Sequence, residues 1–92
     1  MTPATAEAIA VRALGWMAER DDVMEIFLSA TGAAPDDLRT QARDPHFLGF
    51  VLDHLLGQDQ WVLDFAAMSK IEPSDVMSAR AHLPGGDIPN WT

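Results

Sequence analysis

The fold of this chain is decided by residues 44–57, which read DPHFLGFVLDHLLG. Asp44 can cap a helix, and Pro45 suits its first position, where no backbone N–H needs a partner. The segment that follows is apolar except for its histidines and Asp53. A helix that is apolar nearly all round normally lies at the centre of a domain. The stretch therefore predicts a buried central helix.

The same start and stop signals recur on both sides of this segment and divide the chain into helices. Prolines suited to a first helical position stand at residues 3, 35 and 73, and glycines that can end a helix stand at 32 and 57. Strand signals are nearly absent. We predict an all-α fold, a compact bundle of five to six short helices over residues 3–20, 21–31, 35–43, 45–56, 59–68 and 73–83.

Polar residues before the helices are expected to cap them. Thr2 and Asp44 suit the first and fourth helices, and Asp59 suits the fifth. The second helix can be capped by Asp21 or by Asp22, the latter with Glu25 as its capping-box partner.

Apolar side chains at helical spacing are expected to form one core. The first helix carries them along one side, the second has a full i, i+3, i+4, i+7 stripe, and the last two helices have shorter runs. In chain order these residues are Ile9, Ala10, Ala13, Leu14, Trp16, Met17, Val23, Ile26, Phe27, Ala30, Trp61, Val62, Phe65, Ala66, Met68, Val76, Met77 and Leu83.

The chain aligns with itself without gaps at an offset of 38 residues. Identical pairs include Leu14 with Leu52, Asp21 with Asp59, Phe27 with Phe65, Pro35 with Pro73 and Asp37 with Asp75. One interpretation is a three-helix unit used twice. The other is chance, because capping aspartates and first-turn prolines occur in many unrelated helices. Both stay open at this point.

Length and charge restrict the organisation and the partners of the chain. Its 92 residues predict a single helical domain over 1–84 and a C-terminal tail over 85–92, after the break at Pro84. Fourteen acidic and six basic residues give a net charge of −8, which disfavours nucleic acid and membrane surfaces as partners. Without cysteine, a signal peptide or a membrane span, the chain is expected to be soluble and cytoplasmic.

Groups that could carry chemistry are not arranged for it in the sequence. His46, Asp53 and His54 lie on one predicted helix at spacings that do not converge on one ion. A partly buried, hydrogen-bonded His54 is therefore expected instead of a ligand. No nucleophile, phosphate-binding or dinucleotide motif occurs. We predict no catalytic residue, no cofactor, no metal site and no enzymatic activity.

Three aromatic residues are the candidates for an interaction surface: Phe50, Trp61 and Trp91. Tryptophan is enriched at interface hot spots, although core packing is the common alternative and applies equally to Trp61. Trp16 is expected in the core. Trp91 lies beyond the last helix, so it either clamps the tail to the domain or presents itself to a partner.

Four segments together resemble a known family. They are Ala13 to Glu19 (ALGWMAE), Pro35 to Arg39 (PDDLR), Asp44 to Leu48 (DPHFL) with Val51-Leu52-Asp53, and Ala79 to Gly86 (ARAHLPGG). The resemblance is to small alphaproteobacterial helical proteins of about 90 residues without an assigned function, so it implies a fold and no activity. It implies a bacterial cytoplasmic protein and supplies no catalytic residue.

The favoured function is a small acidic protein–protein interaction module, an adaptor or regulator. Its groove or apolar patch would receive a helix or basic segment of a protein partner. The alternative is an acidic nucleic-acid mimic that blocks a basic site on another protein. A small-ligand carrier or enzyme ranks lower. The chain is expected to be a monomer or a homodimer.

Overall fold

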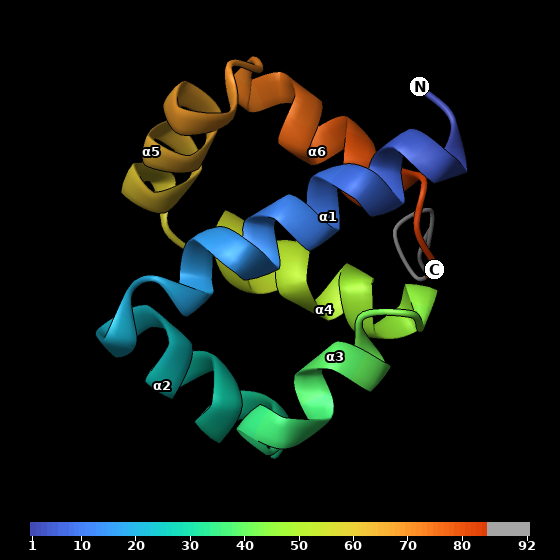
Figure 1. Ribbon diagram of the computed structural model, residues 1–92. Helices are drawn as coiled ribbons and strands as arrows, with labels where there is room; N and C mark the ends of the chain where they lie inside the picture. The colour runs from blue at the N-terminus through green and yellow to red at the C-terminus, as the bar shows by residue number, and fades with distance from the viewer. Residues whose placement is uncertain (85–92) are drawn as a thin grey trace, which may run out of the picture.

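Six α-helices and one turn of 3-10 helix make up residues 1–84, the part of the chain that this computed structural model describes (Figure 1). No strand occurs within these residues, which confirms the predicted all-α fold. In chain order the elements are α1 (Pro3–Ala18), α2 (Asp21–Thr31), η1 (Pro35–Asp37), α3 (Leu38–Gln41), α4 (Pro45–Leu56), α5 (Asp59–Ser69) and α6 (Pro73–Ala81).

Helices α1 and α4 cross the middle of the molecule, with α2 and α3 on one side of them and α5 and α6 on the other (Figure 1). α1 packs against α2, α4 and α6, whereas α4 packs against α5 and α6 as well as α1. The radius of gyration is 12.4 Å, close to the value of about 12 Å expected for a compact chain of this length. The predicted compact bundle is confirmed.

The core lies between the two central helices. Phe47, Leu48, Val51, Leu52 and Leu55 of α4 are buried, as expected for a helix at the centre. The predicted apolar side of α1 is buried along its whole length, Trp16 included. The Trp16 ring meets Phe65 edge-on at 6.3 Å between centroids, and Phe27 meets Phe47 in the same way at 5.6 Å.

Helix α2 buries less than its sequence suggested. Only Val23 and Phe27 enter the core, whereas Ile26 is 53% exposed and Ala30 is also exposed. The expected four-residue stripe is therefore wrong in half of its members. α2 lies at the edge of the molecule against α1, so it contacts the core along one line of residues four apart.

Two of the predicted caps are confirmed and two are wrong. The Thr2 hydroxyl accepts from the Thr5 N–H, and the Asp44 carboxylate accepts from the His46 N–H. Helix α2 instead has Arg20 at the cap position and α5 has Gln58, so the predicted aspartates stand in the first turn. There a carboxylate is favoured by the helix dipole without a capping hydrogen bond.

Helix α6 begins with a capping box that the sequence analysis did not identify. Asp75 accepts the Glu72 N–H at 3.0 Å, and the Glu72 side chain accepts from the Asp75 backbone. Pro73 follows at the first helical position, as predicted. These contacts fix where α6 starts and hence how it lies against α5.

Helix boundaries recur at the 38-residue offset. α2 and α5 coincide to the residue, and α1 and α4 end at matched positions, Ala18 and Leu56. The third elements differ, because η1 and the four-residue α3 stand where the second half has the nine-residue α6. The architecture therefore fits a repeated unit, and the common origin of the two halves stays a prediction.

Candidate functional site

An open groove lies between α5 and α6, beside the end of α4. Its volume is about 750 Å³, which is within the usual range of binding clefts. The lining is mainly apolar and comes from Leu56, Asp59, Val62, Leu63, Pro73, Ser74, Met77, Arg80 and Ala81.

Leu63 of α5 and Met77 of α6 line this groove and remain largely exposed. They are 52% and 63% exposed, although each directly follows a buried valine, Val62 or Val76. A helix turns by about 100° per residue, so the neighbour of a core residue lies at the edge of the core face. Both side chains therefore border the groove instead of entering the core.

The first half of the chain shows that the fold does not require apolar residues there. At the 38-residue offset, Leu63 corresponds to Glu25 and Met77 to Arg39, and both of these charged residues are exposed. Ala81 corresponds in the same way to Arg43. The second half therefore has an apolar surface where the first has an ordinary charged one.

Arg80 lines the groove, but its guanidinium is occupied. Its Nε and Nη2 donate to the two carboxylate oxygens of Asp53, and its Nη1 donates to the Pro84 carbonyl at 3.0 Å. The guanidinium lies against Gly49 of α4, where a Cβ would come within 2.9 Å of Nη1. This bidentate pair joins α6 to α4 and leaves Arg80 little capacity to bind an anion.

Asp59 is the other charged residue of the groove. It is exposed at the first position of α5, and no residue within 1–84 forms an ion pair or side-chain hydrogen bond with it. Because the Arg80 charge is balanced by Asp53, the groove presents one negative charge that no basic side chain of residues 1–84 pairs with.

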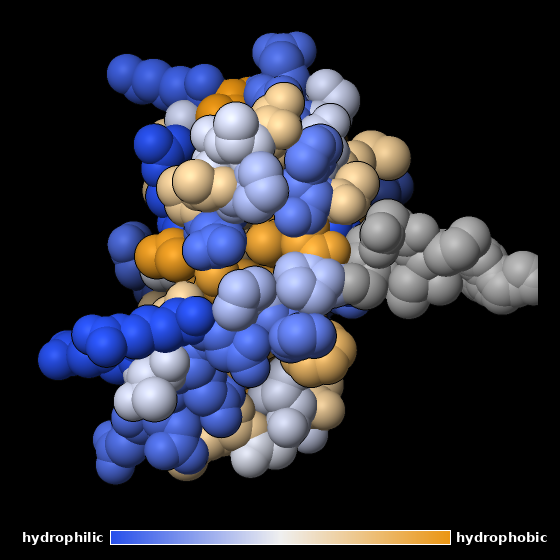
Figure 2. All heavy atoms as spheres, turned by 90° about the vertical axis from the view of Figure 1, so that its right-hand side faces the viewer, coloured by the Kyte–Doolittle hydropathy of each residue, from blue (hydrophilic) through white to orange (hydrophobic). Residues whose placement is uncertain are grey.

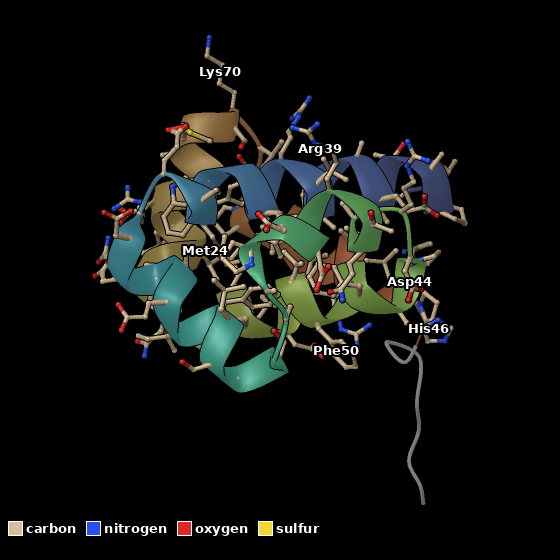
Figure 3. All side chains as sticks on the ribbon, turned by 60° about the horizontal axis from the view of Figure 1, so that its bottom comes forward. Met24, Arg39, Asp44, His46, Phe50 and Lys70 are labelled. Carbon is tan, nitrogen blue, oxygen red and sulfur yellow. The ribbon has the colours of Figure 1, made fainter. Side chains whose placement is uncertain are left out.

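Phe50, a predicted interaction residue, lies on a different surface. It is 56% exposed and borders a hollow of about 410 Å³ among α2, α3 and α4. Figure 3 shows it near Asp44 and His46 on the same side of the molecule. The hollow is lined by Ala30, Thr31, Gln41, Asp44, His46, Phe47 and Phe50, so it is more polar than the α5–α6 groove.

Trp61, the second predicted residue, is half-buried and packs against the core. Its ring centroid lies 5.3 Å from that of His54, and the Phe27 ring centroid lies at the same distance from His54. His54 lies one helical turn after Phe50 on α4, whereas Trp61 belongs to α5. Trp91, the third, lies outside the described residues.

The environment of His54 disfavours its charged form. Burial lowers the pKa of the imidazole, and the backbone of Val23 opposes this less strongly. The expected partial burial is confirmed. The expected hydrogen bond is made to the backbone of Val23, whereas Nε2 is buried without a hydrogen-bond partner among residues 1–84.

A third hollow lies at the end of the molecule where α1 and α4 begin and α6 ends. Figure 2 shows this face, on which a hydrophobic band crosses a largely hydrophilic surface. The hollow has a volume of about 410 Å³, and Leu83 and Pro84 form part of it.

The comparison with protein families identifies the group to which the chain belongs. A family model described as protein of unknown function (DUF3572) matches residues 3–86. The chain is a member of this family. The expected family resemblance is confirmed in this form, whereas the alphaproteobacterial origin stays a prediction. No curated protein and no solved structure matches the chain.

The DUF3572 description names neither an activity nor a site residue. Among residues 1–84, no three His, Asp or Glu side chains are grouped closely enough to hold a metal ion. Within the same residues, no helix has both the length and the apolar character needed to cross a membrane. Four hollows mark the surface of residues 1–84, and the α5–α6 groove has the largest volume among them.

Sequence reasoning did not identify the groove residues. Met77 was expected in the core, Asp59 was expected to cap, and Leu63 was not singled out. One signal was present, because α5 carries apolar residues at 61–63 and 65–68, more than one core-facing side can bury. The Arg80–Asp53 pair had no such signal, since its members are 27 positions apart.

Proposed function

We propose that this chain is a protein-binding module without catalytic activity, and that its α5–α6 groove receives the apolar side of a partner helix. The observation that carries the proposal is the exposure of Leu63 and Met77 across one groove. An unpartnered apolar groove between two helices is the form of surface that helix-in-groove recognition uses.

The energy available at this surface suits a reversible contact. Complete burial of a leucine or methionine side chain contributes about 1.5–3 kcal/mol. Leu63 and Met77 are roughly half-exposed, so covering them contributes about 1 kcal/mol each. Micromolar affinity corresponds to about −8 kcal/mol, so a partner would need further contacts beyond these two residues, for example with the partly buried Leu56 and the exposed Ala81.

The first half of the chain supplies a matched variant for the test. Leu63→Glu with Met77→Arg places the residues of positions 25 and 39 at the corresponding sites of the second half. We expect the double variant to fold, because both positions are exposed and their counterparts are charged. Phe50→Ser serves as the control, since it removes an exposed apolar residue from a different surface.

The experiment is crosslinked affinity capture from the native host with all three proteins as bait. We expect a protein recovered with wild type and Phe50→Ser but lost with Leu63→Glu/Met77→Arg, at unchanged circular dichroism. A protein lost only with Phe50→Ser would move the binding site to the Phe50 surface. If the three baits recover only those proteins that a resin without bait also recovers, the result would contradict a binding function.

A further inference from the structure

We propose that the occupant of the α5–α6 groove is a basic amphipathic helix, with a lysine or arginine beside its apolar stripe that pairs with Asp59. This inference rests on the proposed function and adds the chemistry of the partner. Three features support it: the length of the groove, its single uncompensated charge, and the composition of the alternative occupants.

The α6 wall of the groove fits about two turns of helix. Its lining residues run from Pro73 to Ala81, about 12 Å at 1.5 Å per residue, whereas the lining residues of α5 run from Asp59 to Leu63, about 6 Å. A helix lying along them would present apolar side chains at i, i+3 or i+4, and i+7. Leu63 and Met77 would cover these side chains from opposite walls.

Charge selects a cationic partner. Arg80 is bound by Asp53 and the Pro84 carbonyl, so it offers little to an incoming carboxylate. Asp59 lines the same groove and has no ion-pair partner among residues 1–84. A net charge of −8 on the whole chain adds a long-range attraction for basic segments and repels acidic ones.

Two other occupants lack the required cation. A two-fold dimer through the groove would bring the same surface, with the same free Asp59, from each copy and would supply no balancing charge. Residues 85–92 contain Asp87 and no lysine or arginine. Neither a copy seated groove to groove nor this segment therefore brings an unpaired basic side chain to Asp59.

The test is a selection from a displayed library of helical peptides against the full chain. The library fixes an apolar stripe at i, i+3, i+4 and i+7 and randomises the flanking positions over Lys, Arg, Gln, Glu and Asp. Peptides that also bind Leu63→Glu/Met77→Arg are removed. Dissociation constants of the selected peptides are then measured by fluorescence anisotropy against wild type and Asp59→Asn.

We expect lysine or arginine at one flanking position, and binding about three- to tenfold weaker to Asp59→Asn, as for a partly exposed ion pair. Replacement of that basic residue of the peptide by Gln should weaken binding to wild type by the same factor and should change binding to Asp59→Asn little. Groove-dependent peptides without a charge preference would overturn the basic partner and leave the binding module standing.

Other outcomes would overturn the basic helix in different ways. One such outcome is that no groove-dependent peptide is recovered and that wild type sediments as a dimer, whereas Leu63→Glu/Met77→Arg sediments as a monomer. This result would identify a second copy as the occupant. The selection is repeated against the Ile88→Ser/Trp91→Ser variant, which lacks the two large apolar side chains of residues 85–92. If groove-dependent peptides are recovered with this variant and not with wild type, residues 85–92 are the occupant of the groove. Recovery of no such peptide with either protein, and no dimer, would count against the proposed function itself.

Discussion

Arg80 is the residue that joins α6 to the centre of the molecule. Its side chain is only 15% exposed, and three of its nitrogens are hydrogen-bonded, to Asp53 and to the Pro84 carbonyl. Replacing it removes a charge-assisted contact and leaves the Pro84 carbonyl without this donor. Since Asp53 is half-exposed, water can compensate part of the loss.

We therefore expect Arg80→Met to lower the free energy of unfolding by about 1–2 kcal/mol, with the aliphatic packing of the side chain largely retained. Urea denaturation monitored by circular dichroism measures this change in the free energy of unfolding. Asp53→Asn should cost less, because the Arg80 contact to Pro84 remains. Equal stability of wild type and Arg80→Met would show that the pair orients α6 without stabilising it.

His54 predicts a pH dependence of stability. Burial lowers its pKa in the folded chain below the usual value of about 6.5, so the unfolded chain binds the proton more readily. The free energy of unfolding should fall as the pH drops below about 6.5 and stop falling once the pH passes the lower, folded-state pKa. Above this range the neutral ring contributes its full packing against Phe27 and Trp61.

His54→Gln should flatten this dependence between about pH 7 and pH 5, before most carboxylates titrate. His46→Gln is the matched control, since His46 is on the same helix but exposed. Denaturant midpoints at half-unit pH steps distinguish the two variants. The prediction fails if His54→Gln keeps the wild-type slope.

At the scale of elements, α2 and α5 end in the same way with different residues. Gly32 closes α2 at φ 74°, and Lys70 closes α5 at the matched position with φ 59°. Both are left-handed conformations, which cost an L-residue other than glycine about 1 kcal/mol. The α5 end is therefore strained relative to the α2 end.

Lys70→Gly should raise the free energy of unfolding by up to about 1 kcal/mol, and Gly32→Lys should lower it by a similar amount. Thermal melts of the two single variants and the double variant would measure both effects, and we expect them to add. A lower melting temperature for Lys70→Gly would instead assign Lys70 a stabilising contact at the α5 terminus.

Sequence patterns predicted the elements well because caps and breakers act locally. Prolines 3, 45 and 73 each stand at a first helical position, and Gly32 ends α2 as expected. Ile26 was misplaced because periodicity gives the apolar side of a helix but not how deeply that helix is buried. Asp21 and Asp59 were misplaced by one position, since a cap and a first-turn carboxylate favour the same residues.

At the scale of the whole molecule, the charge is strongly unbalanced. Fourteen acidic residues face six basic ones, and within residues 1–84 Arg80–Asp53 is the one ion pair between a carboxylate and an arginine or lysine. Most carboxylates therefore repel one another without compensation, which opposes the compact state.

Salt should consequently stabilise this protein. We expect the melting temperature to rise by a few degrees, about 2–5 °C, when NaCl is raised from about 0.01 to 0.2 M at pH 7, as the Debye length shortens. Choline chloride at the same ionic strength is the control for effects specific to sodium. A fall in melting temperature with both salts would mean that attractive pairs dominate.

The candidate site was less predictable than the fold for a reason that belongs to this scale. A groove arises from how two helices lie against each other and from the absence of a third, and neither is encoded in one helix. Phe50 could be selected from its own apolar helix, and it is indeed exposed. Leu63 and Met77 became a site only when α5 and α6 were placed side by side.

The contact between Gly49 and Arg80 has an evolutionary consequence. A side chain at position 49 would collide with the guanidinium, which in turn is held by Asp53. Members of the DUF3572 family with a residue larger than glycine at position 49 should therefore lack arginine at 80. In those members, which have no arginine to pair with, position 53 should less often be acidic. Covariation among these three positions across the family would record how closely α6 has been held to α4 throughout its history.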